Sequence, residues 1–237
     1  MTINLILLLS LFIYSPSLSQ NYEVSILGIE IAVVKKQLLN NEVKYSISSS
    51  GLLDLLYPFK NNYTTSYDTA NYNIVNFKKV ISQTDYKSNL EAKFDSSGKL
   101  IYDKKHSVEI PKNTKTIFSL LSMIEQKPYL SVDTKWFNYE HEGEIGRARF
   151  IWADSSFIWN ENDSLLCDHY RLDLELEKPL RGVYEKTDYF MKNIIVENIT
   201  REVWVSKKKP RKIILASIKS DLLPFPIKAK IKETVKE

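Results

Sequence analysis

Residues 170–177 read YRLDLELE, and apolar and charged side chains alternate along the whole stretch. The apolar positions are Tyr170, Leu172, Leu174 and Leu176, and the charged positions are Arg171, Asp173, Glu175 and Glu177. Successive side chains of an extended chain point to opposite faces, so this pattern places all the apolar groups on one face. The stretch is typical of an antiparallel strand with one face in a core and the other in water.

The same alternation recurs along most of the chain. It appears in YEVSILGIEIAVV (22–34), VKYSIS (43–48), YNIVNF (72–77), LIYDKKHSVEI (100–110), PYLSVDTKWF (128–137), RARFIWA (147–153), SFIWN (156–160), IIVENITREVWV (194–205), RKIILASI (211–218) and PIKAKIK (226–232). These stretches predict about ten strands in a mainly β protein. Turn formers separate several of them, as in FDSSGKL around Gly98, ADSS at 153–156 and KKKPRK around Pro210, so we expect sequential strands to pair as hairpins.

Two segments break this pattern and predict helices. In NTKTIFSLLSMIEQKP, Ile117, Leu120, Leu121 and Ile124 have the spacing of one helical face, with Asn113 or Thr114 as the cap and Pro128 as the limit. A shorter candidate is GLLDLLYPF at 51–59. We therefore predict a curled antiparallel sheet, or a half-open to closed β-barrel, with one or two short helices packed inside or at a mouth.

The first nineteen residues, MTINLILLLSLFIYSPSLS, predict an export signal, because an apolar run ends in Pro16 and a small-residue cleavage site. We expect cleavage after Ser19, a periplasmic location and one β-rich domain over 20–237. The run is shorter than the roughly 20 residues of a spanning helix, so an uncleaved anchor is the weaker alternative. Cys167 is the single cysteine and cannot pair within its chain, so we interpret it as a small buried hydrophobe.

Charge is concentrated near the C-terminus. After Ser206 there are ten Lys or Arg and three acidic residues, whereas the whole chain carries a net charge of +4. We consider Lys207, Lys208, Lys209, Arg211, Lys212, Lys228 and Lys230 as a surface for anionic lipid headgroups or lipopolysaccharide. The alternative is that the lysines of 226–232 only protect an edge strand from unwanted pairing.

Motifs for catalysis, metals and cofactors are missing from the sequence. His106, His141 and His169 have no metal-ligand spacing, and their ordinary interpretation is as surface histidines. There is no Gly-x-Ser-x-Gly elbow and no Gly-rich phosphate loop. Asp173 and Glu175 share a strand face, but they alternate with leucines and belong to a solvated face. We therefore expect no catalytic residues, no metal and no cofactor.

Four aromatic residues, Phe150, Trp152, Phe157 and Trp159, lie close together in the sequence. A turn at ADSS would fold their strands back and bring the rings into one neighbourhood. Aromatic rings at this density fill a core or line a pocket for an acyl chain or a sugar. They are our candidate ligand-binding residues.

Three features together resemble a bacterial family: the opening YEVSILGIEIAVV, the FDSSGKLI turn, and the terminal WVSKKKPRKIILASIKSDLLPFPIKAKI. In order and spacing they are similar to domain of unknown function 3108, over about Tyr22 to Ile231. The resemblance implies an exported, all-β, barrel-like bacterial envelope protein with no established activity. Lysines occupy the final turn where that family usually has an acidic residue, so a shared role of this turn does not carry over.

The sequence favours a non-enzymatic periplasmic binding or carrier domain for an apolar or amphipathic envelope ligand, either lipid or glycan. The alternatives are a structural or assembly factor that binds another envelope protein and, less favoured, an unrecognised hydrolase. We expect no nucleic-acid partner and, after signal cleavage, no integral membrane segment. A carrier predicts an apolar cavity of several hundred Å³ under the helix, whereas an assembly factor predicts a filled interior with an exposed apolar patch.

Overall fold

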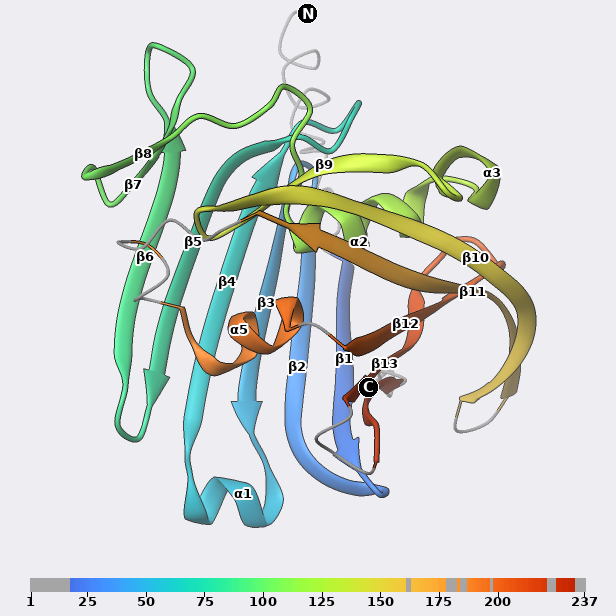
Figure 1. The fold of residues 1–237 in the computed structure, drawn as a ribbon. Coiled ribbons are helices and arrows are strands. Elements are labelled where there is room, and N and C mark those ends of the chain that lie inside the picture. The colour runs from blue at the N-terminus through green and yellow to red at the C-terminus, as the bar shows by residue number, and fades with distance from the viewer. Residues whose placement is uncertain are drawn as a thin grey trace, which may run out of the picture.

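Antiparallel strands in one continuous sheet form the body of the molecule (Figure 1). The computed structural model describes residues 18–160, 163–177, 183, 187–196, 198–220 and 225–232. Within them the strands are β1 (Leu18–Ile26), β2 (Ile29–Leu39), β3 (Glu42–Ser49), β4 (Phe59–Tyr67), β5 (Ile74–Gln83), β6 (Lys87–Phe94), β7 (Leu100–Tyr102), β8 (His106–Val108), β9 (Trp136–His141), β10 (Glu144–Asn160), β11 (Asp163–Leu176), β12 (Ile199–Ser206), β13 (Ile213–Ser220) and β14 (Ile227–Lys232). The helices are α1 (Gly51–Leu56), α2 (Ile117–Gln126), α3 (Tyr129–Val132) and α5 (Tyr189–Ile195).

The strand order is β8-β7-β6-β5-β4-β3-β2-β1-β14-β13-β12-β11-β10-β9. Sequential strands pair as hairpins on both sides of the junction between β1 and β14, where Tyr22 lies opposite Ile231. The predicted mainly β, curled antiparallel sheet is therefore confirmed. Residues 1–17, which hold most of the predicted signal, lie outside the described residues, and cleavage after Ser19 would remove the first two residues of β1.

The segment before α2 links the two halves of the sheet. The amide of Ile74 at the start of β5 donates to the carbonyl of Thr114 at 2.9 Å. Lys115 then pairs with β9, because its amide donates to Asn138 O and its carbonyl accepts from Glu140 N, both at 2.9 Å. These bonds satisfy backbone groups near the edge strand β9, and they curl the sheet towards a barrel.

Helix α2 fills the interior of this barrel. Thr116 caps its first turn, with Ser119 as the reciprocal partner, so the cap lies two residues beyond the predicted Thr114. Eight of its ten residues are buried, and the hydroxyl of Ser122 donates to the carbonyl of Phe118 at 3.0 Å. Because the hydroxyls of Ser119 and Ser122 bond to backbone groups of the helix and its cap, both serines can be buried without unpaired donors.

Aromatic side chains of the sheet surround the helix. The ring of Phe118 has its centroid 5.1 Å from Tyr45, 5.4 Å from Tyr63 and 6.3 Å from Phe77. Tyr102, Tyr139, Phe150 and Tyr170 are also fully buried. Rings at these separations contribute contact energy beyond the area that they bury. Aromatic side chains thus occupy much of the space between α2 and the sheet.

One carboxylate of α2 joins the helix to both halves of the sheet. Glu125 forms an ion pair with Lys36 of β2, and its other oxygen accepts a hydrogen bond from the amide of Ile213 of β13 at 2.9 Å. The side chains of Lys36 and Glu125 are 1% and 4% exposed. Since water cannot replace either partner there, the pair constrains where α2 can sit.

Several local expectations were wrong. ADSS is not a turn, because β10 runs without interruption from Glu144 to Asn160. The stretch 128–137 is mostly α3 and a turn, with its strand starting only at Trp136. The run 22–34 is divided by a turn at Leu27 and Gly28, which have φ of 56° and 79°. Helix α1 forms as predicted, but it has no buried residue and does not plug the barrel.

The edge-protection interpretation of the C-terminal lysines was also wrong. Strand β14 carries Lys228 and Lys230, and it is paired on both sides, with β1 and with β13. The edges of the sheet are β8 and β9 instead. Cys167 is a buried free cysteine, as predicted.

We predict that Lys36→Met lowers the free energy of unfolding by about 3–5 kcal/mol, because it leaves the buried Glu125 carboxylate without its cation. Urea unfolding followed by circular dichroism measures this change. The double variant Lys36→Met/Glu125→Gln should recover part of the loss, since no charge is then buried. Lys44→Met is the matched control: its lysine is 43% exposed in a surface pair, and it should cost at most about 1 kcal/mol. Equal losses in Lys36→Met and Lys44→Met would contradict the assigned role.

Candidate functional site

The four candidate aromatic residues share one face of β10 because of a bulge. Phe150 lies opposite Leu172 and Trp152 opposite Tyr170, and the register then shifts between Trp152 and Asp154. One extra residue reverses the alternation of faces, so the odd-numbered Phe157 and Trp159 follow the even-numbered pair on the same side. At Phe150 that side faces the interior, since Phe150 and Tyr170 are fully buried. Along the outer part of β10 it is exposed, and Ile158 and Leu165 on the opposite face pack against the core instead.

The four rings form a row from the core to solvent rather than a pocket. Phe150 is 0% exposed, and Trp152 is half-buried against Tyr129 of α3, with ring centroids 5.2 Å apart. Phe157 and Trp159 are 68% and 62% exposed. We call Trp152, Phe157 and Trp159 the aromatic row, because Phe150 belongs to the core. The predicted convergence of all four rings was therefore wrong.

The exposed part of the row lies on a two-stranded arm. Strand β9 pairs with β10 only as far as Arg149, and β12 pairs with β11 only from Cys167 to Arg171. Within the described residues, the strands between Ala153 and Leu166 therefore pair only with each other. Figure 1 shows this arm curling away from the barrel at the right. Leu166 lies opposite Phe157 and is 38% exposed, so it extends the apolar face of the row.

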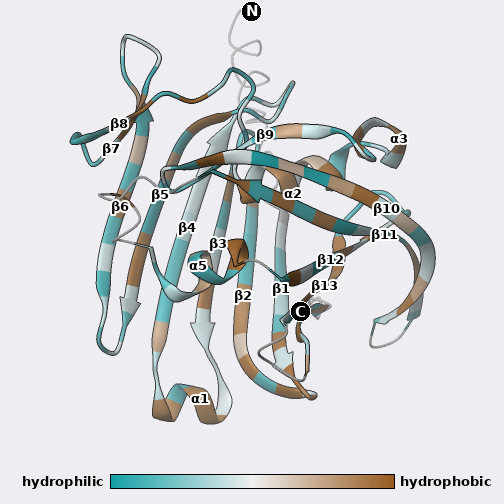
Figure 2. Cartoon of the chain, viewed as in Figure 1, coloured by the Kyte–Doolittle hydropathy of each residue, from teal (hydrophilic) through white to brown (hydrophobic). Residues whose placement is uncertain are grey.

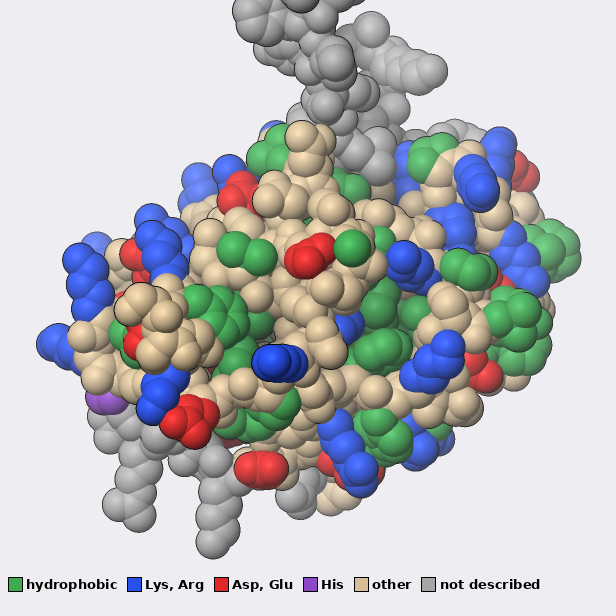
Figure 3. Space-filling view, turned by 90° about the horizontal axis from the view of Figure 1, so that it is seen from above, with side chains coloured by type: hydrophobic (Ala, Val, Ile, Leu, Met, Phe, Trp, Pro, Cys, Tyr) green, Lys and Arg blue, Asp and Glu red, His purple; other side chains and the backbone are tan. Residues whose placement is uncertain are grey.

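The turn between β12 and β13 places basic residues beside the row. The amide of Lys207 donates to the carbonyl of Leu166 at 2.9 Å, so the two segments are in direct contact. Lys207, Lys208 and Lys209 are exposed. In Figure 3, hydrophobic and Lys or Arg side chains lie next to each other along the right margin, where Figure 1 places α3 and the arm.

Asp168 organises the base of this turn. Its carboxylate pairs with Arg211 at 3.0 Å and with Lys207 at 3.3 Å, and Trp152 Nε1 lies 3.4 Å from one oxygen. Arg211 also donates to the carbonyl of Lys127 at 2.7 Å, which connects the turn to the end of α2. Among the described residues, Lys208, Lys209 and Lys212 form no ion pair. These three lysines thus carry positive charge that no described acidic residue neutralises.

Lys228 and Lys230 do not belong to this basic turn. They lie on β14, opposite Ser25 and Glu23 of β1. The basic turn instead contacts β11 at Leu166. The seven basic residues grouped from the sequence therefore divide into two places on the surface.

Sequence reasoning missed a second polar cluster, which is buried in the barrel. The β9–β10 hairpin has its turn at Glu142 and Gly143, with φ of 51° and 92°. Glu140, His141, Glu142 and Glu144 are all 5% exposed or less. Lys79 of β5, which is fully buried, pairs with Glu142 at 2.8 Å and with Asp188 at 3.3 Å. Alternation along a strand predicts opposite faces for such neighbours, and only the inward position of the turn buries all of them.

Burial alters the ionisation of this cluster. It raises the pKa of Glu140 to about 8, partly opposed by the hydrogen bond from the amide of Gly143. Burial raises the pKa of Glu142 to about 7 despite the attraction of Lys79, and the pKa of Glu144 to about 7. It lowers the pKa of His141 to about 3, so this imidazole is neutral. The interpretation of His141 as a surface histidine was wrong.

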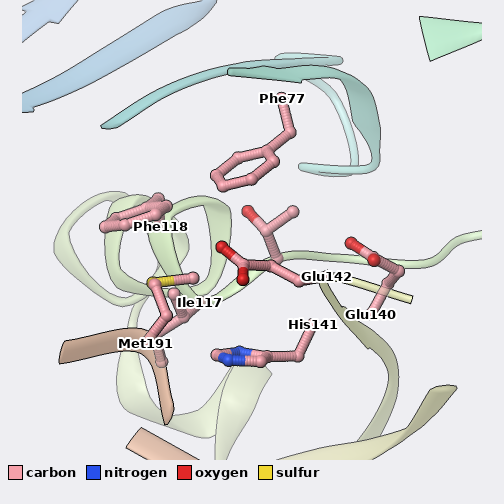
Figure 4. A pocket seen from close by; sticks show the side chains of 8 residues that line it. Phe77, Ile117, Phe118, Glu140, His141, Glu142 and Met191 are labelled. Atoms are coloured by element: carbon pink, nitrogen blue, oxygen red, sulfur yellow. The ribbon is translucent and has the colours of Figure 1, made fainter. Parts of the chain in front are cut away.

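The cluster borders a very small cavity of about 10 Å³, which is room for about one water molecule. Figure 4 shows the carboxylate of Glu142 extending between the side chains of Phe77, Phe118 and Met191, with the ring of His141 next to it. His141 Nε2 and Glu142 Oε1 have no hydrogen-bond partner among the described residues. These polar groups are therefore enclosed in the core.

The described residues include no group of three or more His, Cys, Asp or Glu that could hold a metal ion. His169 stacks on Trp204, with ring centroids 4.2 Å apart, and lies 3.1 Å from a carboxylate oxygen of Glu202. Asp173 and Glu175 form cross-strand ion pairs with Arg149 and Arg147, at 3.0 and 2.6 Å. A hollow of about 330 Å³ lies beside the segment 110–114, outside the barrel core. No described helix is long and apolar enough to cross a membrane.

Comparison with known proteins supports the fold alone. A crystal structure of a beta-barrel-like protein of domain of unknown function DUF1849 from Brucella abortus matches with a TM-score of 0.52. The match covers 91% of this chain and 95% of that chain at 8% sequence identity. No protein-family model and no curated protein sequence matches. The resemblance to domain of unknown function 3108 therefore rests on the sequence pattern.

We predict that Glu140→Gln reduces the loss of stability between pH 5 and 8. Unfolded glutamate loses its proton near pH 4.5, whereas folded Glu140 keeps its proton up to about pH 8. The free energy of unfolding therefore falls across this window, by about 1.4 kcal/mol per pH unit for each such group, and levels off above it. Glutamine keeps the acceptor for Tyr102 and Gly143 and carries no proton to lose.

Urea unfolding at pH 5, 6, 7 and 8 tests this expectation. Glu175→Gln is the control, because Glu175 is 52% exposed and its variant should follow the wild-type pH dependence. If the curves of Glu140→Gln and the wild type were parallel, the assigned protonation would be incorrect.

Proposed function

We propose that this chain is an exported, non-enzymatic binding protein of the bacterial cell envelope that takes an anionic amphipathic ligand on the aromatic row. The observation that carries the proposal is the contact between Leu166 and the basic turn, which brings exposed rings and unpaired lysines together. The predicted signal peptide and the resemblance to domain of unknown function 3108 support the envelope location. The barrel-like neighbour from Brucella is in keeping with a bacterial origin.

The interior of the barrel argues for binding on the surface. The cavity next to α2 holds about 10 Å³, far less than the several hundred Å³ needed to enclose an acyl chain. By contrast, the row offers Phe157, Trp159 and Leu166 to solvent on one face. Contiguous exposed apolar groups of this kind usually mark an interaction site. An acyl chain would lie along these residues.

The basic turn supplies the polar half of the site. Lys208 and Lys209 are exposed and without acidic partners among the described residues, so they are free to neutralise a phosphate or carboxylate. Asp168 already occupies Arg211 and Lys207, and these two hold the turn in place. Positive charge beside tryptophan and phenylalanine is the arrangement that interfacial lipid recognition uses.

The second candidate is an assembly factor that binds a protein strand. Beyond Phe150, one edge of β10 has no neighbouring strand among the described residues, because β9 ends its pairing at Arg149. An extended peptide could add to this edge and place its side chains on the row. An extended partner from the envelope would then replace the lipid.

Binding of lysophosphatidylglycerol below its micellar concentration, measured by calorimetry, tests the proposed function. We expect Phe157→Ala/Trp159→Ala to weaken binding at least ten-fold, which corresponds to about 1.4 kcal/mol. Its stability should be unchanged, because both rings are mainly exposed. Lys208→Glu/Lys209→Glu should remove the preference over lysophosphatidylcholine.

Leu55→Ala is the matched control, because Leu55 is exposed but lies on α1, away from the row. Phe150→Ala should instead lose several kcal/mol of stability, as a core residue. Wild-type protein that binds neither lipid would count against the proposal and favour the strand-binding alternative, which co-purification from the envelope would then identify.

A further inference from the structure

A second apolar surface lies at the end of the barrel where the β1–β2 turn and α1 meet. Its members are Leu27, Ile29, Leu52, Leu55 and Leu56, which are 63%, 65%, 68%, 82% and 73% exposed. We call this set the leucine rim. Figure 2 shows α1 as strongly hydrophobic, although it covers no part of the core. The aromatic row and its proposed ligand do not account for this surface.

The apolar face of helix α1 points to solvent. Leu52, Leu55 and Leu56 have the i, i+3, i+4 spacing of one helical face, and no residue of the helix is buried. The helix is nevertheless held against β2, because the amide of Ser50 donates to the carbonyl of Ile31 at 3.0 Å and the hydroxyl of Ser50 donates to Glu30. Gly51, with φ of 57°, allows this close approach, since a Cβ there would lie 3.2 Å from the carbonyl of Glu30. The exposed leucines are therefore fixed in place.

The other members of the rim lie on the β1–β2 turn, at the end of β2 that holds α1. Ile29 begins β2 opposite Ile26, and Ile26 pairs with Ile227 on β14. Phe225, two residues earlier, is 43% exposed, and Tyr57 at the end of α1 is 38% exposed. Together with the rim they expose on the order of 800 Å², which is about what one partner contributes to a stable interface. A typical monomer exposes no apolar patch of this size.

Charge at the rim is nearly balanced. Lys232 pairs with Glu23 at 3.1 Å and with Glu30 at 3.0 Å, and Asp54 accepts a hydrogen bond from Ser49. Lys60 and Lys228 are the nearby exposed cations. These segments thus carry three acidic residues and, with Lys230 opposite Glu23, four basic residues, a net charge of only +1, in contrast to the cationic turn beside the aromatic row. An apolar surface with so little net charge repels an identical surface only weakly, and it attracts an anionic surface less than the cationic turn does.

We propose that the leucine rim is the interface of a homodimer, with a second copy of this chain as its occupant. In a dimer with a twofold axis, the leucine rim of one copy would pack against the leucine rim of the other. Such an interface requires that the rim is complementary in shape to itself. The area and the charge balance favour a second copy over a membrane. Since the aromatic row lies on a different surface, the dimer leaves it open.

Sedimentation velocity of the mature protein from 1 to 100 μM, without lipid, tests the proposal. The expected result is a dimer whose dissociation constant rises at least 100-fold in Leu52→Ser/Leu55→Ser/Leu56→Ser. Phe157→Ser is the matched control, because Phe157 is equally exposed but lies on the arm, and it should remain dimeric. The single variant Leu55→Lys provides a milder change that should also dissociate the dimer through charge repulsion.

Folding of each variant is checked by its far-UV circular dichroism spectrum, which should be unchanged because α1 buries no side chain. Thermal stability is expected to fall when the dimer dissociates, because association stabilises the folded state. A wild-type protein that is monomeric at 100 μM would overturn the proposal, and its flotation with vesicles would then assign the rim to a membrane. A triple variant that stays dimeric would overturn it equally. Neither result depends on lysophosphatidylglycerol binding, so the proposed function is judged separately.

Discussion

The carboxylate of Glu125 is the interaction on which the interior of this barrel depends. It joins α2 to Lys36 in one half of the sheet and to the amide of Ile213 in the other half. A buried charge with two fixed partners has a strong preference for one geometry, because any displacement leaves a charge or an amide unpaired. The helix is thereby held along the barrel interior, where its Phe118 contacts Tyr45 of β3 and Tyr63 of β4.

The filled interior is the reason that we propose a binding function on the outer surface of the barrel. Barrels that carry ligands leave a lumen between the strands, whereas α2 and the aromatic residues occupy much of this one. The interior also encloses Lys79, Glu142 and Asp188, whose charges are paired with one another. The surface in turn presents the aromatic row with its basic turn and the leucine rim. The difference in charge between these two surfaces is the reason that we propose different partners for them, an anionic amphipath for the row and a second copy for the rim.

Much of the fold was predictable from the sequence, because alternation reports directly on a half-buried strand. The stretch 170–177 became the second half of β11, and the helical spacing around Leu120 became α2. Alternation of apolar and polar residues gave a wrong strand boundary where the side chains switch faces within one continuous strand. The bulge after Trp152 interrupts the alternation of apolar and polar residues in the same way as a turn would. One strand of seventeen residues was therefore interpreted as two.

The candidate site was only partly predictable, for a related reason. The sequence by itself determined the strands, the buried helix, the free Cys167 and the identity of the aromatic and basic residues, since each depends on local pattern and composition. Only the tertiary structure decided which of them meet. Strand β14, which we expected at an edge, is internal because it pairs with β1. The inward turn at Glu142 buries an acidic cluster that the sequence pattern predicts to be exposed to solvent. The contact between Leu166 and Lys207 joins residues 41 positions apart. Such contacts depend on register and closure of the sheet, which no local pattern encodes.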